Sequence, residues 1–121
     1  MITVGAYDAL TFTYADVSGR GGEGEGYRTK PDLAAPGVGI MTRAPGGTVT
    51  AVTGTSFATP FVTGGAALLM EWGIIKENDP YLYGEKIKAY LRRGARQLPG
   101  FAAYPNNQVG YGALCVEESI P

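Results

Sequence analysis

The chain has 121 residues, which suits one small domain, and 45% of them are hydrophobic, so we expect a globular fold. Its 19 glycines and 8 prolines predict many turns. The formal net charge of -1 excludes a strongly basic surface, so we expect neither nucleic acid nor a membrane as a partner. The apolar run at residues 61–72 is shorter than the ~20 residues that a membrane-spanning helix needs.

Histidine and cysteine usage limits the chemistry that the chain can perform alone. The sequence contains no histidine, so a serine nucleophile in it would have to take its base from elsewhere. The single cysteine, Cys115, cannot form an internal disulfide and is interpreted as a packed thiol.

The N-terminal part of the chain predicts a strand and then a loop. Residues 2–8 form a short β-branched run that favours a buried strand, and residues 1–4 are interpreted as its beginning rather than as a leader. The segment 21–26 is rich in glycine and predicts a solvated surface loop. A Ca²⁺ loop is the alternative, for which Glu23 and Glu25 are the carboxylates that the segment supplies. We expect no metal or other cofactor in this chain.

A rigid segment and a hairpin follow. Residues 30–37 (Lys-Pro-Asp-Leu-Ala-Ala-Pro-Gly) carry a proline near each end, which keeps the backbone extended. Asp32 in this segment is interpreted as structural, either as a cap or as an ion-pair partner of Lys30 or Arg43. Two β-type runs flank a Pro-Gly-Gly turn over residues 38–52, which predicts a β-hairpin whose second arm leads into residue 54.

The candidate catalytic residue is Ser56, which lies where the hairpin meets a long apolar run. A serine at a strand-to-helix turn is exposed at the positive end of the helix dipole, and first-turn N–H groups point at whatever it attacks. Gly54 permits close approach of a ligand, Thr55 adds a hydroxyl, and Pro60 is tolerated only near the helix start. An ordinary helix cap is the alternative for Gly-Thr-Ser alone. No lysine lies near Ser56 in the sequence to replace a histidine base.

Two helices are predicted after this turn. Residues 57–73 are apolar all round, so we expect a helix inside a larger body, with Gly73 as its C-terminal cap. Asn-Asp-Pro at 78–80 predicts the start of a second helix, and Leu-Pro-Gly at 98–100 stops it. Four basic residues on this helix are interpreted as a solvated face rather than a binding patch; they are Lys86, Lys88, Arg92 and Arg93.

The longer patterns resemble the subtilisin-like serine proteases (subtilases). The matching segments are Lys-Pro-Asp-x-x-Ala-Pro-Gly at 30–37, Gly-Thr-Ser-x-Ala-x-Pro at 54–60, Val-x-Gly-x-Ala-Ala-Leu at 62–68 and Gly-Tyr-Gly at 110–112. The resemblance covers essentially the whole chain in the family's order. It departs at Phe57, where methionine is frequent, and at Phe61, where histidine is frequent; neither position is the family's catalytic base. Residues 54–61, 78–88 and 110–115 look most like the spore-germination subtilases of anaerobic spore formers.

The resemblance implies an α/β fold: the C-terminal half of a three-layer subtilisin-like fold, with a mostly parallel sheet, a β-hairpin and two main helices. Residues 1–121 would then be an incomplete C-terminal portion of a catalytic domain, because the family's domain is roughly twice as long. The triad Asp, the triad His and the Asn of the oxyanion hole would precede this chain.

For function, the resemblance implies that Ser56 is the nucleophile of a Ser-His-Asp triad, supported by Gly54, Thr55, Phe57 and Pro60. The parent protein would be a serine endopeptidase acting on protein or peptide substrates, and this chain alone would be inactive. A non-catalytic pseudoprotease or binding module derived from a subtilase is the alternative. The missing N-terminal half is the expected partner, and exposed apolar faces predict self-association. The family suggests a secreted or spore-associated location.

Overall fold

Two parallel strands form the centre of the fold, which we describe from a computed structural model for residues 1–19, 21 and 30–121. Strand β1 (Val4–Asp8) pairs in parallel with β3 (Leu33–Pro36), with Val4 opposite Leu33 and Tyr7 opposite Pro36. The short strand β2 (Thr13–Tyr14) pairs antiparallel with the end of β1, so the sheet order is β2-β1-β3. The buried strand predicted at residues 2–8 is confirmed.

The sheet is covered on both faces, which gives the fold its three layers. One face carries Ala6 and Leu33 into a core with the main helices, together with Leu69 and Leu91. The other face carries Tyr7 and Ala34 into a smaller core formed with the C-terminal loops, whose buried members are Leu98, Val109 and Ala113. The mixed α/β fold class is therefore confirmed, as is the burial of the Cys115 thiol, which is free. Both helices contribute to the first core, so they pack on the same side of the sheet.

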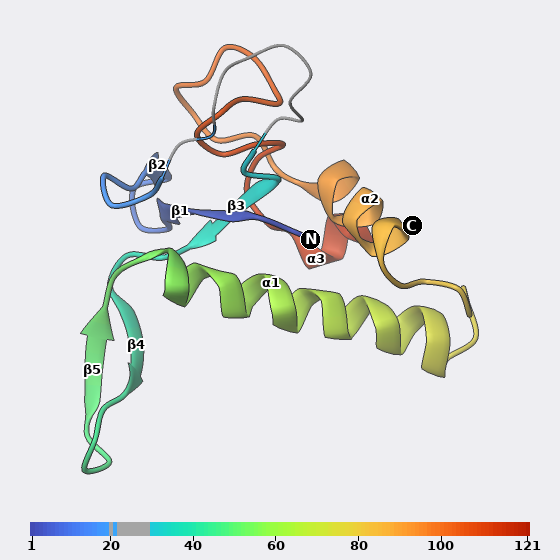
Figure 1. Cartoon of the computed structure of the whole chain (residues 1–121), viewed down its shortest axis with the longest axis horizontal. Helices are drawn as coiled ribbons and strands as arrows, with labels where there is room; N and C mark the ends of the chain where they lie inside the picture. The colour runs from blue at the N-terminus through green and yellow to red at the C-terminus, as the bar shows by residue number, and fades with distance from the viewer. Residues whose placement is uncertain (20, 22–29) are drawn as a thin grey trace.

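The predicted hairpin is confirmed and stands apart from the sheet. Strands β4 (Ile40–Arg43) and β5 (Val49–Val52) pair antiparallel, with Ile40 opposite Val52. Figure 1 shows the hairpin extending away from the beginning of the long helix. Because β5 ends just before that helix, the hairpin delivers the chain directly to the Gly-Thr-Ser turn.

The long helix α1 (Thr55–Met70) continues without a break into a π-helical segment, η1 (Glu71–Ile75). The prediction of Gly73 as a cap is wrong: Gly73 is buried inside η1, and its carbonyl accepts a hydrogen bond from the Asp79 N–H at 2.9 Å. A Cβ on Gly73 would lie 2.7 Å from Leu82 Cδ2, so glycine is needed here for close packing rather than for ending the helix.

The observed helix is longer than the apolar run at residues 61–72 that was judged too short to span a membrane. Residues 55–75 form one helix of 21 residues that is long and apolar enough to cross a membrane by length and composition. Only 28% of its most apolar window is buried in the structure. A helix in the interior of a larger protein passes the same test of length and composition. The length of this helix therefore does not distinguish a membrane-spanning helix from a core helix.

The second helix begins later than predicted. Helix α2 (Glu85–Gly94) follows Gly84, whose φ is 59°, so the start assigned to residues 78–80 is wrong. Residues 78–80 instead fold back on η1, where the Asn78 side-chain amide donates to the Trp72 carbonyl at 2.9 Å. A last short helix, α3 (Val116–Ser119), packs against α2, where a Cβ on Gly94 would meet Ser119.

Asp32 lies at the centre of a buried ion cluster. Its carboxylate is fully buried and binds Lys30 at 2.7 Å, Lys88 at 3.6 Å and Arg92. The structural role and the Lys30 pair are confirmed, whereas the Arg43 pair is wrong, because the Arg43 guanidinium donates to the Gly47 carbonyl.

The basic residues of α2 are only partly a solvated face. Lys88 is 4% exposed and also donates to the Met1 carbonyl at 3.1 Å, and Arg92 lies over the Tyr111 ring at 4.9 Å. Lys86, by contrast, is partly exposed and pairs with Asp79 at 2.6 Å. The charges of Lys88 and Arg92 therefore join α2 to the beginning of β3, which corrects the prediction for these two residues.

The pKa of Asp32 reflects a balance between burial and hydrogen bonding. Burial raises the pKa of this carboxyl, but hydrogen bonds from Lys30, from the Thr3 N–H and from Arg92 outweigh it and lower the pKa from 3.8 to about 2. Because the folded-state pKa lies below the unfolded-state value, the ionised carboxylate stabilises the fold above pH 4. That stabilisation is lost as the pH falls from about 4 to about 2.

Substitution of Asp32 by Asn should therefore destabilise the protein in a pH-dependent way. At pH 7 we expect a loss of about 3 kcal/mol, since buried cations remain without their partner. The loss should shrink by about 2 kcal/mol between pH 5 and pH 2. Urea unfolding of both proteins between pH 7 and pH 2 measures this difference in the free energy of unfolding, and a variant at an exposed residue, Asp16→Asn, is the control. A pH-independent loss would contradict the depressed pKa.

The acidic loop containing Glu23 and Glu25 lies outside the described residues, so its prediction remains open. Within the described ranges no group of three His, Cys, Asp or Glu side chains converges in a way that would hold a metal ion.

Candidate active site

The Gly-Thr-Ser turn is tied to the end of the parallel sheet. Past the end of β3, the carbonyl of Gly37 accepts a hydrogen bond from the Gly54 N–H at 2.8 Å, while the Gly37 N–H donates to the Tyr7 carbonyl at 3.1 Å. This chain of contacts runs from β1 through Gly37 to the residue that precedes α1. The beginning of α1 is thus fixed at the carboxyl ends of both parallel strands, the edge where α/β proteins place their sites.

Gly54 adopts a backbone conformation that other residues avoid. Its φ of 150° and ψ of 163° lie in a region essentially reserved for glycine. A Cβ at this position would meet nothing closer than 3.7 Å, so a side chain would not clash with its neighbours. Glycine is required here because of the backbone conformation. This conformation lets the chain leave the hairpin and enter α1 within one residue.

Ser56 is exposed in the first turn of α1. The first backbone bond of the helix joins the Phe57 N–H to the Gly54 carbonyl at 3.1 Å, so the N–H groups of Thr55 and Ser56 precede the helical bonding pattern. The first turn contains no acidic residue that would offset the helix dipole. Ser56 is therefore an exposed residue of a first turn whose N–H groups have no acidic side chain of that turn beside them, and donors of this kind can stabilise a developing oxyanion.

Pro60 and Thr59 modify the bonding of this first turn. Pro60 lies inside α1 and has no N–H, so the Ser56 carbonyl receives no helical bond from it. The Thr59 hydroxyl donates to the Thr55 carbonyl at 3.0 Å, and is used within the helix. The Thr55 carbonyl is therefore bonded by a side chain, whereas the Ser56 carbonyl lacks its helical partner.

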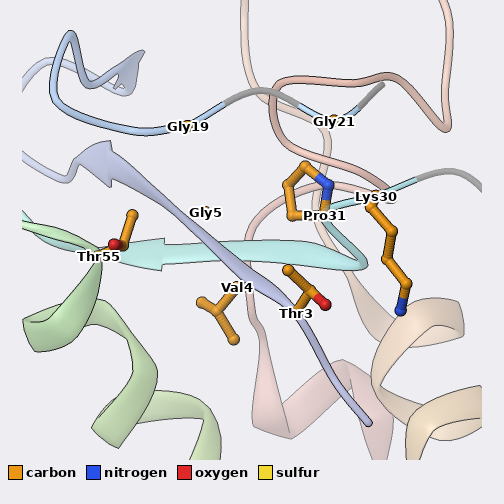
Figure 2. Close-up of a pocket in the computed structure, with 8 residues that line it drawn as sticks. All are labelled: Thr3, Val4, Gly5, Gly19, Gly21, Lys30, Pro31 and Thr55. Carbon is orange, nitrogen blue, oxygen red and sulfur yellow. The ribbon is translucent and has the colours of Figure 1, made fainter. Parts of the chain in front are cut away.

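Two cavities flank the serine. Thr55 borders a cavity of about 250 Å³ whose other walls come from the beginning of β1, from Gly19 and Gly21 and from the Lys30–Pro31 segment; Figure 2 shows these residues around β1. Phe57 and Pro60 border a more apolar cavity of about 260 Å³, closed by Phe61 and by Ile40, Met41 and Thr42 of the hairpin. The sequence-predicted site residues are thus brought together, with Gly54, Thr55 and Ser56 at the turn and Phe57 and Pro60 on one flank.

No side chain of the described residues supplies a base to Ser56. The sequence contains no histidine, and each of its four lysines is placed elsewhere. Lys30, Lys86 and Lys88 are bound to carboxylates, and Lys76 follows η1 at the far end of the long helix. Within the described residues, no side chain beside Ser56 could therefore act as the proton acceptor that a serine nucleophile would require.

Comparison with known proteins places the chain in a family. A sequence model of the subtilase family (peptidase S8) matches residues 1–112. Subtilisin Savinase from Lederbergia lenta is 35% identical over 78 residues, which cover 64% of this chain and 27% of that protein. Subtilisin from Bacillus pumilus is 56% identical over 39 residues, covering 32% of this chain and 14% of that protein. The chain belongs to the subtilase family.

Solved structures agree with this placement. The Clostridium perfringens CspB protease superimposes with a TM-score of 0.94 at 44% identity, covering 99% of this chain and 25% of that one. The prenylagaramide maturation protease PagA superimposes with a TM-score of 0.78 at 30% identity, covering 99% of this chain and 41% of that one. The matched segments thus span about a quarter of the length of Savinase and of the CspB protease.

Sequence reasoning missed Gly37, which links the sheet to the turn. A Cβ on Gly37 would lie 2.6 Å from Ala6 Cβ and 2.9 Å from the Gly54 carbonyl, so the close approach requires glycine. The Pro-Gly pair that ends the rigid segment was the available signal, but the sequence does not say which distant residue it would touch.

A pair of glycine substitutions in α1 and its cap should separate backbone strain from helix propensity. Gly54→Ala should lower the free energy of unfolding by about 1–3 kcal/mol, because its φ of 150° is strained for any other residue. Gly64→Ala, at an exposed helical position with no atom within 4 Å, should raise it by up to ~1 kcal/mol. Urea unfolding of both variants tests this; equal effects would contradict the special role of Gly54.

Proposed function

We propose that residues 1–121 are the C-terminal part of a subtilase catalytic domain and that Ser56 is its nucleophile for peptide-bond hydrolysis. The observation that carries the proposal is the exposed Ser56 hydroxyl at the N-terminal end of α1, within the Gly-Thr-Ser-x-Ala-x-Pro pattern. Membership of the subtilase family and the coverage of only a quarter of the CspB protease support it.

In this proposal Ser56 Oγ attacks the carbonyl carbon of a peptide bond while an imidazole from outside this chain accepts its proton, as in the well-characterised triad of subtilisin. The oxyanion is held by the Ser56 N–H and by a donor outside the chain, with the Thr55 hydroxyl nearby. The imidazolium then returns the proton to the leaving amine, and water hydrolyses the acyl ester on Ser56. Phe57, whose ring is partly exposed, narrows the leaving-group side of the cleft.

The isolated chain should be inactive under this proposal, since its sequence has no histidine. Its natural partner is then the N-terminal portion of the same catalytic domain, and its substrates are proteins or peptides. The narrower assignment to spore-germination subtilases belongs to the proposal and rests on the three sequence segments that resemble them. A binding module derived from a subtilase is the competing function, and the missing base is the observation that favours it.

A serine-directed fluorophosphonate probe tests the proposal. The isolated chain should not be labelled at a useful rate, because Ser56 lacks a base. After co-refolding with the portion of the C. perfringens CspB protease that precedes its matching segment, Ser56 should become labelled, as located by peptide mass spectrometry. Ser56→Ala should abolish the labelling in the same mixture.

Two results would count against this reading. Stoichiometric labelling of Ser56 in the isolated chain would show that the base is not external. Formation of a stable complex whose Ser56 stays unlabelled would favour the non-catalytic binding module instead.

A further inference from the structure

A third cavity lies at the root of the hairpin, close to the Gly-Thr-Ser turn. Its volume is about 280 Å³, near the lower end of the roughly 300–1,000 Å³ of ligand pockets, which gives room for one long side chain. Val38 comes shortly before β4 and Thr53 directly follows β5, so both ends of the hairpin contribute to the wall. The rest of the wall comes from the end of β1, from β2 and from the residues that follow β2: Asp8, Thr13, Tyr14, Ala15, Asp16 and Val17.

This cavity lies at the same edge of the sheet as Ser56. Asp8 is the last residue of β1, and the Tyr7 before it is bonded through Gly37 to Gly54. Thr53 precedes Ser56 by three positions, so their Cα atoms are at most about 11 Å apart. An extended peptide rises about 3.3 Å per residue. A substrate that crosses Ser56 therefore reaches the cavity two or three residues from the bond that is cleaved.

The hairpin places this cavity on one side of the cleaved bond. Under the proposed function Phe57 borders the leaving-group side, and the cavity beside Phe57 is closed by residues of β4. Figure 1 shows the hairpin starting next to the beginning of α1. Because the third cavity is built on the root of the same hairpin, the substrate residues after the cleaved bond are the ones that pass it.

The charge of this cavity is negative. Asp8 and Asp16 line it, and none of its lining residues is basic. Among residues 1–19, 21 and 30–121, no lysine or arginine forms an ion pair with either carboxylate. Asp8 Oδ1 accepts a hydrogen bond from the Leu10 N–H at 2.9 Å, which leaves the charge of the carboxylate in place. The described part of the chain thus supplies two carboxylates beside the nucleophile and no cation to neutralise them.

Apolar side chains form the other part of the wall. Val17 and Val38 border the cavity together with the two carboxylates. Lysine and arginine have an apolar stem and a charged head, so the stem can contact the valines while the head meets the carboxylates. An acidic side chain would be repelled at the same place. The wall therefore matches one long basic side chain.

We propose that this cavity, the hairpin-root pocket, selects peptide substrates that carry Lys or Arg two or three residues after the cleaved bond. Asp8 and Asp16 are its specificity-determining residues. The proposal rests on the proposed function and adds a substrate class to it. Because Asp16 is exposed, the ion pairs produce a several-fold preference rather than an absolute requirement.

Capture of the acyl group by added peptides tests the leaving-group side alone. The chain, co-refolded with the N-terminal portion of the CspB protease, is acylated at Ser56 with a peptide ester. The amino group of an added peptide then replaces Ser56 on the acyl carbon, in the reverse of leaving-group departure, and competes with water. The added peptides are Ala-Lys-Ala amide, Ala-Ala-Lys amide and their norleucine analogues, which keep the apolar stem and lack the charge.

Lysine at one of these two positions should raise the ratio of captured to hydrolysed product about fivefold over norleucine. Salt at about 1 M should weaken this preference. The double variant Asp8→Asn with Asp16→Asn should abolish it, and asparagine at position 8 keeps an oxygen to accept from the Leu10 N–H. Glu85→Gln with Glu117→Gln removes two exposed carboxylates outside the pocket and should retain the preference.

A titration of the isolated chain measures binding without catalysis. In NMR spectra the amide signals of Val17 and Thr53 should shift on addition of the lysine peptides and stay unchanged with the norleucine peptides. The double asparagine variant should show neither shift, whereas the double glutamine variant should behave as the parent chain does.

The outcomes separate this proposal from the catalytic one. Lysine-selective shifts in a complex whose Ser56 is never labelled would keep the basic-residue pocket and overturn the protease function. Labelling of Ser56 with equal capture of lysine and norleucine peptides would keep the function and overturn the selectivity. A lysine preference that survives both asparagine substitutions would overturn the assignment to Asp8 and Asp16. Displacement of the lysine peptides by Ca²⁺ at constant ionic strength would identify a metal ion as the occupant and overturn the proposal.

Discussion

The hydrogen bond between the Gly54 N–H and the Gly37 carbonyl is the contact on which the rest of the site depends. It is 2.8 Å long and joins the end of the rigid β3 segment to the residue before α1. Gly37 is simultaneously bonded to Tyr7 of β1, so one glycine connects both parallel strands to the helix. An exposed serine on a loop would be mobile, whereas the position of Ser56 is fixed by the hydrogen bonds that join its turn to a buried sheet.

The sheet that supports this contact is itself held by an unusual arrangement of charge. The carboxylate of Asp32 is fully buried and receives three cationic side chains and the Thr3 N–H. Two of those cations come from α2, so the helix that covers the core also neutralises the beginning of β3. A buried carboxylate without such partners would cost several kcal/mol, which explains why α2 presents basic residues inward rather than only to solvent.

The sequence predicted the local elements better than their long-range contacts. The β-branched run, the Pro-Gly-Gly turn and the apolar stretch after Ser56 each carry their own periodicity, so the strand, hairpin and long helix were predicted. The errors at Gly73, at residues 78–80 and on α2 have one physical origin. Gly73 is glycine because Leu82 packs on it, and Lys88 is buried because Asp32 lies opposite; neither neighbour is visible in the local pattern. The turn at Ser56 was recognisable because its residues are contiguous, whereas its anchor at Gly37 is 17 positions away in the chain.

The ion cluster also has a consequence for the order in which the protein folds during synthesis. Asp32 and Arg92 are separated by 60 positions, so β3 leaves the ribosome with Lys30 beside Asp32 but well before Lys88 and Arg92 exist. Until then, closing the sheet would bury the Asp32 carboxylate with Lys30 as its one cationic partner, which disfavours early closure. Helix α1 has no such dependence and can form as soon as it emerges. The nascent chain should therefore hold a formed α1 beside an open sheet and close only when translation has passed α2.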